Sequence, residues 1–353
     1  MLMIGRALQG MSSAMTWTAG LALVVDTVDE QHVGQAMGWI GLATSLGVLL
    51  SPVLGGVVYG ESGYYPVFAM CFAILAVDII LRLMIIEVKE AGKWKLDQSD
   101  VVFHKGASAA GSAFQSRASD ATMSIPASSL GSELSSVKAV ISKLVRRPRL
   151  LAALWGTLAH ATSQTAFDST LPLLVSSTFG WDSLGAGLVF LPLALPTFLG
   201  PLVGAVGDRY GSKWLTTGGF LFSVPFLMCL RFVTENSLQH KILLCSLLTG
   251  SGIAAALCLG PLLAEITWAV RYGDDELSVK PYALAYGFFN LAYSGGALLG
   301  PIWGGTITEK ASFGTLGWSL ALLMFVTGIV NFIWVGPPPR AFAEAGHVAV
   351  QDM

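Results

Sequence analysis

Two ten-residue stretches decide the fold of this chain: GVLLSPVLGG at residues 47–56 and GALLGPIWGG at residues 296–305. Both follow the pattern G-x-x-x-[GS]-P-x-x-G-G, and each lies inside a long apolar segment. Small residues at this spacing form a helix face on which a second membrane helix packs closely, and the proline adds a kink. The match predicts two related halves. The predicted packing residues are Gly47, Ser51, Pro52, Gly55 and Gly56 in the first copy and Gly296, Gly300, Pro301, Gly304 and Gly305 in the second.

The sequence around these stretches is too apolar for a soluble protein. Of its 353 residues, 54% are hydrophobic and 12% are charged, whereas a soluble domain carries about 25% charged residues. About 20 apolar residues cross a bilayer as a helix, and segments of that length are too long for barrel strands. We therefore predict an all-α, polytopic membrane bundle of nine spans, at 3–26, 36–59, 66–87, 150–177, 183–207, 214–234, 240–268, 282–307 and 314–336.

A long polar connector divides these spans into two groups. Residues 1–87 hold three spans, 88–149 form a loop rich in Ser, Ala and Gly, 150–338 hold six spans, and 339–353 form a tail. Within the loop, residues 135–147 are predicted to form an amphipathic helix on the membrane surface. Lys and Arg gather on the side that holds the loop, so the loop and the C-terminus are predicted to be cytoplasmic.

The positions of the two copies also bear on the N-terminal half. The second copy lies on the fifth span after the long loop, but the first lies on the second span of the chain. If the halves match, three helices would precede the first span. A natural protein of nine helices is the alternative.

Three motifs together resemble those of the major facilitator superfamily, in its drug–proton antiporter branch near the vesicular amine transporters. GRALQG at residues 5–10 is similar to the R-x-x-Q-G motif of the fourth helix in that family. The doubled stretch resembles the antiporter motif of helices five and eleven. GAVGDRYGSK at residues 204–213 resembles the loop between helices eight and nine. The resemblance implies that the nine spans are helices four to twelve of a twelve-helix fold.

The resemblance also implies a conformational latch in the loop at 204–213. In the family, the acid of this loop caps a neighbouring helix and pairs with basic groups in one transport state. A solvated turn is the alternative. The residues assigned to the latch are Gly204, Asp208, Arg209, Gly211 and Lys213.

Two carboxylates inside predicted spans are candidates for the transport pathway, because an ionisable side chain there is costly and is usually functional. Asp168 precedes Pro172, which can break the helix locally and leave a site for a cation or a proton. The alternative is a structural hydrogen bond to Thr165 or Ser169. Glu265 is a candidate proton carrier, and the alternative is an interhelical lock to Arg271 or another basic group. Related amine transporters have acids at both places.

Four further polar residues belong to the predicted pathway. Arg6 either faces the cavity, as the resemblance implies, or extends to the outer headgroups. Asn290 stands where amine transporters have an aspartate, and its amide cannot titrate. It can still orient a polar substrate. His160 is either a proton relay or a packing histidine, and Gln164 shares its helix face.

The expected function is proton-coupled export of a small amphiphilic or cationic solute by alternating access, as in multidrug efflux antiporters. No nucleotide-binding, zinc-binding or nucleophile motif is present, so we expect no enzyme activity, catalytic residue, metal, cofactor or nucleic-acid partner. The expected partners are the lipid bilayer, a small-molecule substrate and protons. A full-length protein is expected to be a monomer. The expected location is the plasma membrane or a vacuolar or vesicular membrane. The alternatives are a truncated, non-transporting pseudotransporter or regulatory membrane partner, and a uniporter.

Overall fold

A computed structural model describes residues 2–28, 32–84, 140–271 and 281–336. Within these ranges every regular element is a helix. The chain divides into two compact units, one of residues 1–53 and 139–353 and one of residues 54–138.

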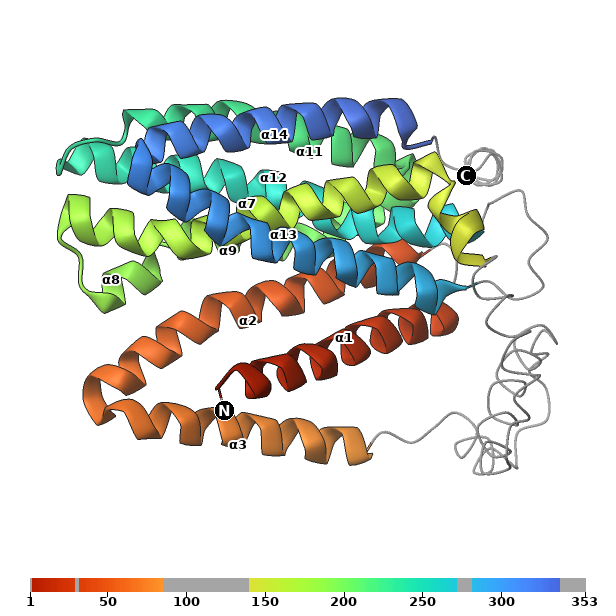
Figure 1. Ribbon diagram of the computed structural model, residues 1–353, viewed down its shortest axis with the longest axis horizontal. Helices are drawn as coiled ribbons and strands as arrows, with labels where there is room; N and C mark the ends of the chain where they lie inside the picture. The colour runs from red at the N-terminus through yellow and green to blue at the C-terminus, as the bar shows by residue number, and fades with distance from the viewer. Residues whose placement is uncertain (1, 29–31, 85–139, 272–280, 337–353) are drawn as a thin grey trace, which may run out of the picture. The chain divides into compact units, whose positions relative to one another are not determined.

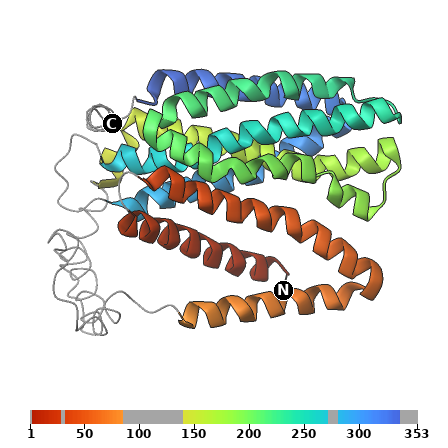
Figure 2. The same cartoon turned by 180° about the vertical axis from the view of Figure 1, so that it is seen from behind.

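The larger unit is built mainly from long helices that run side by side (Figure 1). The glycine-rich helix α13 packs along α7, α11 packs on α12 and α14, and α1 lies beside α13. Figure 2 gives the same bundle from behind. Its long helices are α1 (Leu2–Thr27), the first part of α2 (Val33–Ser62), α7 (Pro148–Phe179), α11 (Ser212–Cys229), α12 (Leu238–Arg271), α13 (Tyr282–Lys310) and α14 (Phe313–Trp334).

The span predicted at 183–207 is a chain of shorter pieces rather than one continuous helix. Three of these pieces have a proline at their first or second position. Proline lacks an amide proton and clashes with the carbonyl four residues back, so each one ends the preceding stretch. The pieces are α8 (Ser183–Leu188), α9 (Leu191–Ala194), the 3-10 turn η3 (Leu195–Leu199) and α10 (Gly200–Tyr210).

The smaller unit contains the rest of α2 and α3 (Tyr64–Met84). Gly63 separates the two helices and has a φ of 82°, which a glycine adopts without steric cost. Of the amphipathic helix predicted at 135–147, residues 140–145 are helical, and 135–139 lie outside the described residues.

Six described segments are long and apolar enough to cross a membrane, whereas the sequence predicted nine spans. The helices α1, α7 and α13 are also long, at 26, 32 and 29 residues, but they are not among these six segments. The six segments are Val33–Ser62, Tyr64–Leu81, Leu184–Tyr210, Ser212–Phe232, Leu238–Arg271 and Phe313–Trp334.

The second copy of the repeated stretch forms the contact between α13 and α7. A Cβ atom on Gly296, Gly300 or Gly304 would overlap or crowd atoms of α7, including the Thr162 carbonyl oxygen next to Gly300. The two backbones therefore approach at a distance that only glycine permits. Gly305 faces away, with no described atom within 4 Å of its added Cβ, and the same is true of Gly47, Gly55 and Gly56 in the first copy.

Replacing Gly300 with alanine is expected to destabilise the bundle. The new methyl group would lie 2.5 Å from the Thr162 carbonyl oxygen, so the helices must separate, and such overpacking costs about 1–3 kcal/mol. The matched control is Gly305→Ala on the same helix, which is expected to change the free energy of unfolding by less than about 0.5 kcal/mol. Titration of the purified proteins with sodium dodecyl sulfate measures both, and equal effects would refute the close packing.

Candidate functional site

Asp208, in the last turn of α10, caps the N-terminus of α2. Its Oδ1 accepts a hydrogen bond from the Gly34 amide at 2.6 Å, and its Oδ2 accepts one from the Gln35 amide at 2.8 Å. These amides lie in the first turn of α2, where N–H groups have no partner within the helix and the helix dipole favours a negative charge. Asp208 is 8% exposed. One buried carboxylate thus joins segments 174 residues apart in the sequence.

Four glycines let α2 and α10 approach closely beside this cap. A Cβ on Gly204 would overlap the Gly34 carbonyl oxygen, and a Cβ on Gly38 would overlap the Gly200 carbonyl oxygen. We call these four residues the glycine contact. Sequence reasoning singled out only Gly204. The other three could have been found from their spacing. The two glycines on α2 are four residues apart, as are the two on α10, and this spacing lets membrane helices pack closely.

The other residues assigned to the latch surround the turn between α10 and α11. Gly211 has a φ of 88°, so its left-handed backbone makes the turn. Arg209 is exposed, with its guanidinium 5.7 Å from the centre of the Tyr210 ring. The Lys213 ammonium lies 4.9 Å from the Phe332 ring on α14. In this state, the described partners that hydrogen-bond Asp208 are backbone amides of α2 rather than these basic groups.

Glu265 on α12 is fully buried and joins the ends of three helices. Its carboxylate forms an ion pair with Arg149 at the start of α7, through Nε to Oε1 and through Nη2 to Oε2, the latter at 3.1 Å. The Ser212 hydroxyl, at the start of α11, donates to Oε2. The sequence left open a proton carrier or a lock to a basic group, and the structure places Arg149 in that position. Arg147 adds a cap to α12 by donating to the Ala269 carbonyl oxygen at 2.8 Å.

Asp168 on α7 is exposed and lies near Tyr293 of α13, close enough for the two groups to interact electrostatically. The alternative prediction was a hydrogen bond between Asp168 and the hydroxyl of Thr165 or Ser169, and the structure does not contain it. Thr165 donates instead to the Ala161 carbonyl oxygen at 2.8 Å, and Ser169 to that of Ala166 at 2.9 Å.

Two more residues of the predicted pathway lie on α13 and α1. Asn290 is half-buried one turn before Tyr293, so these two side chains share a face of α13. Arg6 is exposed on α1, and its Nη1 donates to the Gln9 side-chain oxygen at 3.1 Å.

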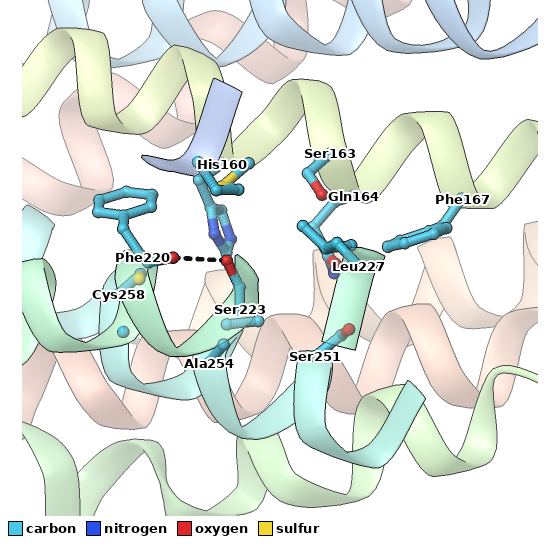
Figure 3. A pocket seen from close by; sticks show the side chains of 13 residues that line it. His160, Ser163, Gln164, Phe167, Phe220, Ser223, Leu227, Ser251, Ala254 and Cys258 are labelled. Carbon is cyan, nitrogen blue, oxygen red and sulfur yellow. Dashed lines mark hydrogen bonds between the residues drawn. The ribbon is translucent and has the colours of Figure 1, made fainter. Parts of the chain in front are cut away.

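His160 and Gln164 line a small cavity inside the bundle (Figure 3). The cavity lies among α7, α11, α12 and α14, and Asp168 does not line it. The sequence grouped these three residues in one pathway, whereas the structure gives them different surroundings. Within the part of the chain that is described, no three His, Cys, Asp or Glu residues come together as a metal site.

The family model of the Major Facilitator Superfamily matches residues 1–269 of this sequence. The chain belongs to the major facilitator superfamily. It is accordingly a multi-pass membrane transporter.

Three relatives show which members of the superfamily this facilitator is similar to. It is 35% identical to the MFS-type transporter ppzB of Metarhizium majus, over 95% of this chain and 79% of the relative. It is 31% identical to an uncharacterized MFS-type transporter of Schizosaccharomyces pombe, over 94% of this chain and 73% of the relative. The vesicular acetylcholine transporter of Drosophila melanogaster is 26% identical over 91% of this chain and 48% of the relative. The facilitator therefore resembles the vesicular amine transporters.

Proposed function

We propose that this facilitator exports a small amphiphilic or cationic organic solute in exchange for protons by alternating access. The observation that carries the proposal is the cap of α2 by Asp208, which joins two parts of the chain that are far apart in the sequence. In our proposal this contact breaks and re-forms during transport. The name of one relative, the vesicular acetylcholine transporter, supports an organic cation as the solute.

The contact between α2 and α10 suits a rigid-body movement. A helix cap contributes about 0.5–2 kcal/mol, which is small enough for solute or proton binding to offset. The glycine contact presents two smooth backbones without interlocking side chains. Rotation of packed domains about such an interface is a common form of switching. In our proposal the cap closes one face of the transporter and opens when the other face closes.

Asp168 is the proposed site where proton and solute compete. Its carboxylate is exposed rather than held in an ion pair, whereas Glu265 is enclosed by Arg149 and Ser212. A carboxylate attracts an organic cation when ionised and loses that attraction when a proton binds. Asn290 and Tyr293, on the facing helix, would offer hydrogen bonds to a polar solute.

We propose that the end of the bundle bearing Asp208 and Glu265 faces the cytoplasm. Basic residues are enriched in cytoplasmic segments near membrane helices. Among the described residues, Lys143, Arg146, Arg147, Arg149, Arg209, Lys213 and Arg271 lie at this end, and Arg6, Arg231, Lys241 and Lys310 lie towards the other. The membrane itself would be the plasma membrane or a vacuolar or vesicular membrane.

Flux of ethidium, a fluorescent amphiphilic cation, tests the exchange. The purified chain is reconstituted into liposomes with an acidic lumen, and the membrane potential is clamped with potassium and valinomycin. We expect ethidium to accumulate in the lumen and to leave when an uncoupler dissipates the pH gradient. Asp168→Asn should lower the initial rate by about tenfold or more, the effect of losing about 1.4 kcal/mol of interaction.

The other outcomes of this experiment contradict the proposal in distinct ways. An ethidium flux that does not change when the uncoupler is added would indicate a uniporter. An absence of gradient-driven flux from folded protein would favour a non-transporting membrane partner. A full rate in Asp168→Asn would remove Asp168 from the pathway.

A further inference from the structure

The cavity around His160 is lined by both polar and apolar side chains. His160, Ser163 and Gln164 enter it from α7, Ser223 from α11 and Ser251 from α12, as Figure 3 shows. His160 is 8% exposed and Ser251 is 7% exposed. Most of the remaining lining residues are aromatic or aliphatic.

Several polar groups in this cavity lack a protein partner among the described residues. The Ser251 hydroxyl is buried and has no hydrogen bond to a described residue. The His160 imidazole lines the cavity without a hydrogen bond to another described side chain. The Ser223 hydroxyl donates to the Phe220 carbonyl oxygen at 2.7 Å, so its lone pairs remain able to accept. Buried polar groups are nearly always hydrogen-bonded, and a small polar cavity with several such groups is where proteins hold water.

His160 has no charged neighbour in the lining of the cavity. Of the residues that line the cavity from the four helices, His160 and Cys258 are the titratable ones, and no carboxylate, lysine or arginine lies among them. A proton on the imidazole would therefore place an unpaired charge inside the bundle, which is costly unless water solvates it. Proton uptake and entry of water at this position must accompany each other.

We propose that the cavity is a hydrated proton-binding site, distinct from Asp168, in which His160 accepts a proton from water. The proton passes from a hydronium ion to the lone pair of an imidazole nitrogen, which leaves a water molecule in the cavity and an imidazolium beside Ser223 and Ser251. The additional charge draws more water between α7, α11, α12 and α14. Acid thereby loosens the packing of these helices. This inference goes beyond the proposed function because it requires no solute.

Hydroxyl-radical footprinting of the purified protein tests the site without any transport assay. Radicals formed in trapped water oxidise adjacent side chains even when these are buried, and methionine becomes a sulfoxide. Met324 lines the cavity and is 4% exposed, whereas Met37 is 0% exposed and lies outside it. We expect Met324 to be oxidised several-fold faster than Met37. This ratio should rise as the pH is lowered, because acid favours the charged imidazole and the water that solvates it.

Two variants separate protonation from packing. His160→Gln should keep the ratio of Met324 to Met37 oxidation high but independent of pH, and slow oxidation of Met37 certifies that this variant is folded. Ser251→Ala removes an unpartnered hydroxyl and should lower the ratio at every pH. Equal oxidation of Met324 and Met37 throughout would overturn the hydrated site. A pH-dependent rise that persists in His160→Gln would overturn the assignment of the proton to His160.

Discussion

Replacing Arg149 with methionine is expected to destabilise the protein by about 3–5 kcal/mol, the usual effect of removing one partner from a buried ion pair. Glu265 is 0% exposed. Without the guanidinium its charge would keep Ser212 as its described side-chain partner, far from water. Titration with sodium dodecyl sulfate measures the change in the free energy of unfolding.

Two control variants make this prediction specific. Arg209→Met also removes an arginine at the same end of the bundle, but Arg209 is exposed, so its effect should stay within about 0.5 kcal/mol. The double variant Arg149→Met with Glu265→Met should recover most of the loss, because it removes both charges together. If Arg149→Met costs no more than Arg209→Met, the ion pair does not stabilise the bundle.

Replacing Asp208 with alanine is expected to slow transport of ethidium by about tenfold or more while costing only about 0.5–2 kcal/mol of stability, the usual range for a lost helix cap. Asp208 caps a helix of the N-terminal part of the chain. In our proposal, its loss removes the contact that holds one face of the transporter closed. Initial rates in liposomes and unfolding in detergent measure the two effects separately.

Asp182→Ala is the matched control for this variant. Asp182 is also a capping aspartate, but it accepts from the Gly185 amide at 2.9 Å within its own segment. It should lose a similar amount of stability and keep its transport rate. If both variants transport equally well, the cap by Asp208 has no part in the transport cycle.

Features that repeat locally in the sequence could be predicted from it. The two copies of one stretch and the long apolar segments led to the helical membrane fold, and the turn at Asp208 came from a short motif. The breaks between α8 and α10 were also visible in principle, because three of the pieces have a proline at their second position. The four glycines of the glycine contact were likewise present at a spacing that promotes helix association.

Features that depend on distant partners could not be predicted in this way. Glu265 and Arg149 are 116 residues apart, and several basic residues could equally have served as the partner. The surroundings of His160 required knowing that α7, α11, α12 and α14 meet around it, since helix periodicity gives a face but not what lies opposite.

The most direct test of alternating access in this protein is to measure the distance between α2 and α10. Spin labels at His32→Cys and Tyr210→Cys, two exposed positions beside the cap, report it by pulsed electron paramagnetic resonance when the four native cysteines are replaced. We predict a short and a long separation in the protein with Asp208, and a shift towards the long one in Asp208→Ala. A single short separation in both proteins, under acidic and alkaline conditions alike, would contradict the account.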